Sequence, residues 1–315
     1  MRTLITRRSV ALSGLTALAS RRVRAQSVLR IAYLKSTSDL ALSKAHGSLE
    51  AALAQMGVSV EWAGPFAAAA PALEALNANA VDVTVGSSTA FVTARAAGVK
   101  LVLFGYQRLA PGGEALIVKA GSSVRALADL RGKSVAVNRG GTGEYILARG
   151  LQNAGISLAD VTRVYLGPVD AKAAFARGDV DAWAIWDPFL SIAVESGEAR
   201  VLADGAACAS ENAVTYFVRQ DYLSANRSVV KTLFDVLVRE NRWGAAHPVE
   251  AGALWAKELG LPVSLASRLG RNNTPPLGPV GKVQADEVAR IADWFAGNGI
   301  VPTRPDVASF LADLT

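Results

Sequence analysis

One pattern of apolar and polar positions occurs twice in the chain, at residues 75–88 and 174–187. Each segment begins as an alanine-rich helix, passes through a small or polar turn, and continues from a Val-Asp pair into a strand whose apolar residues alternate with a period of two. The strand stops at small or polar residues, which are typical of a helix start. We therefore expect the same helix, turn and strand at two places in the fold.

The similarity continues on both sides of these segments. Strands are expected around the first copy at 29–33, 58–62 and 100–104, and around the second at 133–137, 162–166 and 199–202. The helices expected at 89–97 and 188–196 both stop at a glycine, Gly98 and Gly197, which suits the left-handed conformation beyond a helix end. Alternating strands and helices predict an α/β protein of two lobes with largely parallel sheets. An amphipathic helix is expected after each of the strands at 29–33 and 133–137, and a short helix is expected at 123–130. The alternative is a chance similarity within one long α/β sheet.

Two expected strands do not belong to the repeat. Residues 114–118 form a short apolar run after a turn-rich stretch, and 212–218 form another where the chain must return to the first lobe. We expect both to cross between the lobes and to form a hinge that opens and closes. The predicted organisation is a signal peptide, the first part of lobe 1, lobe 2 with a crossing strand, and the return strand with the C-terminal helices of lobe 1, at residues 1–25, 27–112, 113–212 and 213–315.

The C-terminal part of the chain has a helical pattern. Apolar residues recur at spacings of three and four in three segments, 228–247, 249–258 and 285–298. The proline-rich stretch 272–279 separates the last two, and it is not expected to be regular helix or central strand. With 51% hydrophobic residues, the chain has enough apolar surface for two packed cores.

The positive charge of the chain lies at its N-terminus. The formal net charge is +6, and residues 1–25 contain no acidic residue. The basic residues of this segment are Arg2, Arg7, Arg8, Arg21, Arg22 and Arg24. The remaining chain is therefore neutral and has no basic stripe with interleaved aromatic residues, so we do not expect it to bind nucleic acid.

Residues 1–25 also have the order of parts found in an export signal. Arg7 and Arg8 precede a mild apolar run, and Val23-Arg24-Ala25 provides a small-residue cleavage site. The segment resembles a twin-arginine signal, and its apolar run is shorter than the ~20 residues that span a bilayer. We expect export to the periplasm without a membrane anchor. The alternative is an exposed amphipathic helix at the N-terminus.

Residues that would indicate metal binding or catalysis are scarce. Cys208 is the single cysteine, so it cannot form an intramolecular disulfide, and no Cys/His cluster has the spacing of metal ligands. His46 and His247 lie in expected helices, and no Ser-His-Asp or Cys-His pattern is present. The glycine run after residue 139 lacks the spacing of a Walker loop or a dinucleotide fingerprint. We expect no metal, no cofactor and no catalytic residues.

A ligand site is expected at the carboxyl ends of the parallel strands, where loops lead into helix N-termini. Hydroxyl groups, glycines and basic side chains occur there, and free N–H groups at helix starts favour an anion. The candidate ligand-binding residues are Lys35, Ser36, Thr37, Ser87, Ser88, Arg139, Gly140, Gly141, Thr142, Trp186 and Asp187, with Tyr216 on the return strand. The alternative for the serines is ordinary helix capping.

The dipeptide Trp186-Asp187 allows two interpretations. Asp187 followed by Pro188 is a good N-cap and first helical residue, which would make its role structural. In the functional interpretation, Trp186 covers an apolar part of the ligand and Asp187 meets a donor group or orients a neighbouring base.

Four segments resemble a known family. They are Val-Leu-Arg-Ile-Ala-Tyr at 28–33, Ala-Leu-Glu-Ala-Leu-Asn at 72–77, Leu-Ala-Asp-Leu-Arg-Gly-Lys at 127–133, and Gly-Asp-Val-Asp-Ala-Trp-Ala-Ile-Trp-Asp-Pro at 178–188. All resemble the aliphatic sulfonate-binding proteins of ABC importers, within the nitrate, sulfonate and taurine binding group. The resemblance implies a type II periplasmic-binding-protein fold, a small anionic ligand (a sulfonate) in the cleft and delivery to an ABC transporter permease; we expect a monomer.

The chain departs from the family at two of the ligand-facing loops. A Gln-Lys-Gly usually follows the first strand in the family, and a lysine opens the glycine or serine loop. Here the corresponding residues are Leu34-Lys35-Ser36 and Asn138-Arg139-Gly140. The positive charge is present at both places, so anion binding is expected, and the exact ligand is left open.

Two other functions are compatible with the sequence. One is a binding protein for another small anion or for a pyrimidine. The other is an enzyme, because the same fold resembles sulfinate desulfinases that use a nucleophilic cysteine in the cleft of the first lobe. Cys208 falls after the last strand of the second lobe instead, which argues against the enzyme.

Overall fold

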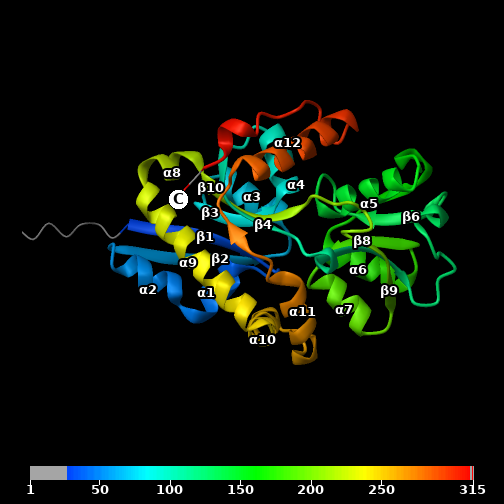
Figure 1. Cartoon of the computed structure of the whole chain (residues 1–315), viewed down its shortest axis with the longest axis horizontal. Helices are drawn as coiled ribbons and strands as arrows, with labels where there is room; N and C mark the ends of the chain where they lie inside the picture. The colour runs from blue at the N-terminus through cyan, green and yellow to red at the C-terminus, as the bar shows by residue number, and fades with distance from the viewer. Residues whose placement is uncertain (1–26, 313, 315) are drawn as a thin grey trace, which may run out of the picture.

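The computed structural model describes residues 27–312 and residue 314. The expected signal peptide at 1–25 lies outside the described residues. The chain forms two lobes, each built on one sheet with helices on both faces (Figure 1). Lobe 1 contains a six-stranded sheet in the order β11-β4-β10-β3-β1-β2, and lobe 2 a five-stranded sheet in the order β7-β6-β8-β5-β9. The two-lobe α/β prediction is confirmed.

The elements follow the predicted repeat closely. The strands of lobe 1 are β1 (Ser27–Leu34), β2 (Val58–Phe66), β3 (Val83–Ser87), β4 (Leu101–Arg108), β10 (Ala213–Arg219) and β11 (Leu277–Gly278). Those of lobe 2 are β5 (Glu114–Lys119), β6 (Ser134–Val137), β7 (Thr162–Tyr165), β8 (Ala182–Trp186) and β9 (Ala199–Asp204). Gly98 and Gly197 both have a positive φ, +81° and +75°, as their places after helix ends predict.

Helices cover both sheets. Those packed on the sheet of lobe 1 or appended to it are α1 (Asp39–His46), α2 (Ser48–Ala54), α3 (Ala69–Asn77), α4 (Ser88–Ala96), α8 (Gln220–Ala225), α9 (Arg227–Ala246), α10 (Pro248–Leu259), α11 (Ala266–Asn273) and α12 (Lys282–Gly297). Those of lobe 2 are α5 (Thr142–Asn153), α6 (Pro168–Arg177) and α7 (Phe189–Glu195). In the part of the chain that the structure describes, no helix is long and apolar enough to cross a membrane.

The two strands outside the repeat are central members of the sheets. β10 runs antiparallel between β3 and β4, and β5 runs antiparallel between β8 and β9. The crossings themselves are the short segments 109–113 and 205–212, which join β4 to β5 and β9 to β10. A strand that enters from the other lobe runs against its neighbours, and its backbone groups are satisfied by pairing on both sides.

Three local expectations need correction. The single helix expected after β1 is interrupted at Gly47 and becomes α1 and α2. The helix expected at 123–130 is only a 3₁₀ turn at Leu127–Leu130. The proline-rich stretch begins within α11 and ends in β11, which pairs with β4 at the sheet edge, where a strand tolerates neighbouring prolines.

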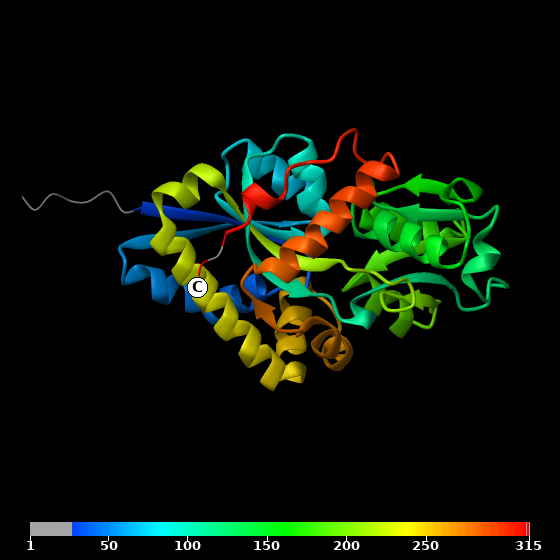
Figure 2. The same cartoon turned by 45° about the horizontal axis from the view of Figure 1, so that its top comes forward.

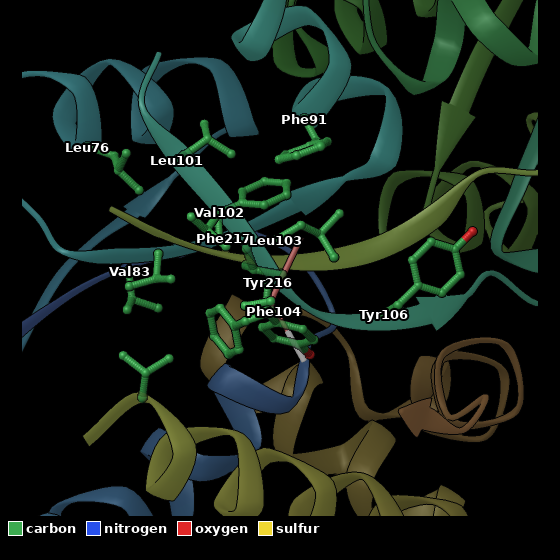
Figure 3. Packing of buried hydrophobic residues seen from close by; sticks show 14 of the residues in the cluster. Leu76, Val83, Phe91, Leu101, Val102, Leu103, Phe104, Tyr106, Tyr216 and Phe217 are labelled. Carbon is green, nitrogen blue, oxygen red and sulfur yellow. The ribbon is translucent and has the colours of Figure 1, made fainter. Parts of the chain in front are cut away.

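Aromatic side chains pack on both faces of the lobe 1 sheet. Phe217 on β10 stacks on Phe91 of α4 with ring centroids 5.8 Å apart, while Tyr216 and Phe104 point to the opposite face, toward α1 and α9 (Figure 3). All four are buried. The core of lobe 1 is therefore continuous around the return strand, and β10 is packed on both of its faces.

The C-terminal helices reach from lobe 1 to lobe 2 at two places. α11 lies next to α7 (Figure 1), and α12 extends toward α5 (Figure 2), where Trp294 Nε1 donates to Gln152 Oε1 at 3.1 Å. The rings of Trp294 and Tyr145 meet edge to face, with centroids 5.6 Å apart. The lobes are thus linked by side-chain contacts as well as by the two chain crossings.

Candidate functional site

A cavity of about 870 Å³ lies between the two sheets. It is lined by residues that follow the carboxyl ends of six parallel strands, three in each lobe, and by the first turns of α3, α4, α5 and α6. This is the position expected for a ligand in an open parallel sheet. The predicted residues that line it are Lys35, Ser36, Thr37, Ser87, Arg139, Gly140, Gly141, Thr142, Trp186 and Asp187.

On the lobe 1 side, a short backbone hydrogen bond holds the start of the loop after β1. The backbone N–H of Lys35 donates to the carbonyl of Phe66 at 2.7 Å, which ties this loop to β2. The Lys35 side chain is exposed, and within residues 27–312 its ammonium has no hydrogen-bond or ion-pair partner. Lys35 therefore contributes an available positive charge at one side of the cavity.

Ser87 has a capping role at the same side. Its Oγ accepts a hydrogen bond from the N–H of Ala90 at 3.1 Å and lies 2.7 Å from Oγ1 of Thr89. The residue caps α4 as the alternative interpretation of the serines predicts, and it also lines the cavity.

On the lobe 2 side, the glycine loop is shaped by two neighbouring side chains. Glu144 Oε2 accepts from the N–H of Gly140 at 2.7 Å, and Asn138 Oδ1 accepts from the N–H of Gly143 at the same distance. Gly140 has φ of +59°, and a Cβ on Gly141 would lie 1.9 Å from Asn138 Nδ2. Glycine is required here so that the loop can wrap around Asn138.

Arg139 presents a positively charged group to the cavity. Its guanidinium lies over the ring of Tyr165, 3.7 Å from the centroid, and Tyr165 Oη donates to Glu144 Oε1 at 2.7 Å. Arg163 donates to the same carboxylate oxygen at 2.8 Å. Burial and the hydrogen bond to Glu144 raise the pKa of Tyr165. Among the described residues, no carboxylate pairs with Arg139, so stacking orients its charge without neutralising it.

Trp186 and Asp187 lie side by side but in different environments. Trp186 is half-buried and lines the cavity. Asp187 is only 3% exposed, and its carboxylate accepts from Ser191 N at 3.0 Å, Ser191 Oγ at 2.7 Å, Asn272 Nδ2 at 3.1 Å and Asn273 Nδ2 at 3.0 Å. Burial raises the pKa of Asp187, and these hydrogen bonds oppose that rise. Both carboxylate oxygens are therefore engaged by protein donors.

Two predicted residues do not line the cavity. Ser88 is completely buried, and its Oγ donates to Asn212 Oδ1 at 3.0 Å. Tyr216 is also completely buried, and its hydroxyl donates to Asp39 Oδ2 at 2.8 Å. Ser88 points toward the second crossing, and Tyr216 lies in the middle of β10 on the face covered by α1, away from the strand end that borders the cavity.

Sequence reasoning missed the loops after the two edge strands. Ala67, Ala68 and Leu166 line the cavity after β2 and β7, together with Asn138 and Tyr165. Both edge strands, β2 and β7, are expected from the sequence, and each has a proline close to the start of the next helix. The rule that ligands lie at the carboxyl ends of parallel strands predicts these residues when it is applied to every strand.

A buried hydrogen-bond network joins the lobes beside the cavity. Asn212 Nδ2 donates to Glu114 Oε2 and to Thr142 Oγ1, both at 3.0 Å, while its Oδ1 accepts from Ser88. One side chain thus connects the first residues of α4 and α5. Burial raises the pKa of Glu114 to about 7, against the effect of its hydrogen bonds from Asn212 and Ser210.

The single cysteine is remote from this cavity. Cys208 is completely buried in lobe 2 and is not among the residues that line the space between the lobes. Burial raises the pKa of its thiol to about 12. A thiol with a raised pKa is a poor nucleophile at neutral pH. In the described part of the chain, no group of acidic, histidine and cysteine side chains could hold a metal ion.

Comparison with known proteins supports the predicted resemblance. Residues 53–251 match the family model described as NMT1/THI5 like. A relative from Escherichia coli strain K12, named as an aliphatic sulfonates-binding protein, is 33% identical over 302 residues, which cover 95% of this chain and 93% of the relative.

Solved structures give the same result. The alkanesulfonate-binding protein SsuA from Xanthomonas axonopodis pv. citri, bound to MOPS, superposes with a TM-score of 0.84 at 31% identity, covering 91% of this chain and 98% of that one. The periplasmic aliphatic sulphonate binding protein SsuA from Escherichia coli superposes with a TM-score of 0.81 at 32% identity, covering 90% and 97%. These relatives are binding proteins, and the Escherichia coli protein is periplasmic.

A more distant structure shares only the fold. A mutant of the desulfurization enzyme DszB, in complex with biphenyl-2-sulfinic acid, has a TM-score of 0.68 at 17% identity, covering 91% of this chain and 97% of that one. The likeness to the SsuA proteins is much higher in both sequence and structure. The chain therefore belongs to the NMT1/THI5-like family, and within it is similar over nearly its whole length to aliphatic sulfonate-binding proteins.

Proposed function

We propose that the chain is an exported solute-binding protein that captures an aliphatic sulfonate in the cavity between its lobes and delivers it to an ABC transporter permease. The observation that carries this proposal is the pair of basic side chains, Lys35 and Arg139, that border the cavity from opposite lobes without a carboxylate partner in the described chain. The similarity to the two SsuA proteins supports the same ligand class.

The cavity suits a ligand with one anionic end and one apolar part. A sulfonate keeps its charge at physiological pH, so it needs donors and no proton acceptor. The donors are the two basic side chains, hydroxyl groups and the N–H groups at helix starts. Apolar side chains such as Ala69, Leu73 and Leu166 cover another part of the wall. The proposed ligand-binding residues are Lys35, Ser36, Thr37, Ser87, Arg139, Gly140, Gly141, Thr142 and Trp186.

Movement of the lobes belongs to this proposal. We treat residues 27–112 with 213–315 as lobe 1 and residues 113–212 as lobe 2, with segments 109–113 and 205–212 as the hinge of a monomer. Closing the lobes around a ligand excludes water from the donors and strengthens each contact. Affinity then depends on how readily the lobes close.

A calorimetric titration with a panel of ligands tests the function. The panel contains alkanesulfonates of increasing chain length, taurine, sulfate, nitrate and a pyrimidine. We expect alkanesulfonates to bind and the inorganic anions to bind weakly, because only a sulfonate places apolar atoms against the apolar wall. Binding of nitrate, sulfate or the pyrimidine in preference to every sulfonate would identify the other candidate ligand class.

A variant of the single cysteine tests whether the protein binds its ligand without catalysis. Cys208 lies away from the cavity, so Cys208→Ala is expected to leave ligand affinity unchanged. Release of sulfite from a sulfinate by the wild type, lost in this variant, would favour the desulfinase instead.

Export through a twin-arginine signal is the last part of the proposal. Arg7 and Arg8 lie outside the described residues, so the support comes from the sequence alone. Replacing both with lysine should leave unprocessed precursor in the cytoplasm. An unchanged yield of mature protein that begins near Gln26 would exclude this route.

A further inference from the structure

The carboxylate of Asp187 joins two parts of the molecule that are far apart in sequence. One oxygen accepts from Ser191 in its own lobe, at 3.0 and 2.7 Å. The other accepts from the side-chain amides of Asn272 and Asn273 at the end of α11, at 3.1 and 3.0 Å. Its backbone N–H donates to the carbonyl of Gly113 at 3.0 Å. The carboxylate is therefore a junction between lobe 2 and α11.

The end of α11 is fixed to lobe 1. The carbonyl of Pro275 accepts from Gln107 Nε2 at 2.8 Å and from Asn241 Nδ2 at 2.9 Å, and these donors lie on β4 and α9. At the other end, α10 is tied to the loop after β1, because Trp255 Nε1 donates to the Ser38 carbonyl at 3.0 Å. A contact between Asp187 and α11 is consequently a contact between the lobes.

Other side chains support this contact. Ile192 of α7 packs against the apolar cluster that contains Leu265 and Leu269. Glu195 Oε1 lies 3.4 Å from an Arg268 nitrogen, although that pair is partly exposed and adds little. α7 and α11 therefore form a packed interface around the Asp187 carboxylate, which explains why water is excluded from it.

We propose that Asp187, Asn272 and Asn273 are positioning residues that hold the lobes together around the ligand and thereby set its affinity. This inference rests on the proposed function, because it concerns binding in the same cavity. Asp187 does not need to touch the ligand, since both of its oxygens already accept from protein donors.

The effect on affinity follows from the population of the closed form. When only a fraction of the molecules is closed, the apparent Kd rises by the inverse of that fraction. Opening separates Asn272 and Asn273 from the carboxylate, so two hydrogen bonds to a charged group are exchanged for hydrogen bonds to water, at a net cost of about ten- to a hundredfold in the closing equilibrium each, or about 1.5–3 kcal/mol. The three hydrogen-bonding groups thus bias the equilibrium toward the closed form, and weakening them lowers affinity without any change in the ligand contacts.

Asn272 offers the cleanest test because it does not line the cavity. We expect Asn272→Ala to raise the Kd of the best sulfonate about tenfold, the effect of losing one hydrogen bond to a charged group. Asn272→Asp should raise it further, because two carboxylates then face each other. The order of preference among chain lengths should stay the same. Asn153→Asp, the same change on an exposed residue of α5, is the matched control.

A charge exchange distinguishes positioning from ligand contact. In the double variant Asp187→Asn with Asn272→Asp, the donor and the acceptor change places, so affinity should recover to within about threefold of the wild type. If Asp187 contacts the ligand directly, the exchange cannot restore binding. A double variant as weak as Asn272→Asp alone would overturn the inference.

Interlobe distance provides a readout that needs no ligand. Spin labels at Gln55→Cys and Lys172→Cys, exposed residues of the two lobes, are compatible with the buried Cys208. Asn272→Asp should shift the distance distribution toward longer values, and the double variant should reverse that shift. Unchanged distances in Asn272→Asp would overturn the inference. If no sulfonate binds the wild type but the distances shift, the proposed function fails and the interlobe contact stands.

Discussion

The ends of β3 and β8 occupy equivalent places in the two lobes but have different roles. In lobe 1, Ser87 caps α4 and lines the cavity. In lobe 2, Asp187 also bonds the helix that follows, at Ser191, yet its carboxylate is buried against α11. Ser87 is the N-cap of α4, as the sequence predicts, whereas the N-cap of α7 is Pro188 and Asp187 lies one residue before it. The two positions differ because α11 covers the Asp187 carboxylate, whereas Ser87 faces the cavity.

The same contrast applies to the loops that carry the two basic residues. The glycine loop of lobe 2 is held by buried side chains, and Arg139 is stacked on Tyr165. The loop after β1 is tied to β2 by the Lys35 N–H and to α10 by Trp255, and its lysine side chain is exposed without a partner in the described chain. Lobe 2 therefore presents a charge that is oriented by stacking, and lobe 1 presents a charge that no side chain orients. Four predictions compare the two lobes and the junction between them.

The largest expected effect lies at the junction between the lobes. The pKa of Glu114 rises from 4.5 to about 7 because of burial, and each pKa unit corresponds to about 1.4 kcal/mol, so ionising it in the folded protein costs on the order of 3 kcal/mol. The folded state holds the proton that the unfolded state loses near pH 4.5. Stability should thus fall as pH rises from about 4.5 to 7 and level off above it.

Glu114→Gln should remove this part of the pH dependence. Denaturant unfolding at pH 5 and pH 8 measures it, and the difference between the two pH values should shrink in the variant. Asp39 in lobe 1, whose pKa burial also raises to about 7, should maintain a residual slope. An identical pH dependence of stability in the variant and the wild type would contradict its assignment to Glu114.

The next effect compares how the glycine loop of lobe 2 and the end of β3 in lobe 1 are held. Glu144→Ala removes the acceptor of Gly140, Tyr165 and Arg163 together, and we expect a loss of about 2–3 kcal/mol of unfolding free energy. Ser87→Ala removes only a helix cap and should cost about 1 kcal/mol. Denaturant titrations of both variants give the comparison. Equal losses would show that the glycine loop and the end of β3 are held equally well.

The third effect concerns ligand affinity. Arg139→Ala should weaken sulfonate binding by about ten- to a hundredfold, since a hydrogen bond to a charged group contributes about 1.5–3 kcal/mol. Lys35→Ala should have a smaller effect, because an unrestrained lysine loses more side-chain entropy on binding. Calorimetry on both variants decides the order. If Lys35→Ala is the more damaging, the lobe 1 loop provides the main anion contact.

The smallest expected effect on affinity concerns the apolar part of the ligand and not its anionic group. Trp186 is half-buried at the cavity wall, so Trp186→Ala should weaken long-chain sulfonates by about 1–2 kcal/mol and short ones by less. A series of chain lengths measured by titration provides the test. Equal losses across the series would place the alkyl chain elsewhere in the cavity.

The sequence predicted the fold well because the repeated pattern is local. Period-two strands, alanine-rich helices and the glycines at helix ends each result from interactions within a few residues. The candidate cavity could be predicted to the same extent, because parallel strands place all their carboxyl ends at one edge. Lys35, Arg139 and Trp186 follow directly from that rule. The same rule also predicts the cavity-lining residues in the loops after β2 and β7, which were not among the candidate residues.

The tertiary structure decided what contacts these residues. Nothing near Asp187 in the sequence indicates Asn272 and Asn273, which lie on a helix that the pattern did not predict. Tyr216 and Ser88 were assigned to the cavity because their segments lie near it, and only packing shows that their hydroxyls bond Asp39 and Asn212 instead. Local sequence determines which strand end a side chain occupies. Whether that side chain meets ligand, water or another helix depends on segments that come from elsewhere in the chain, because burial and hydrogen bonding are properties of the assembled surface.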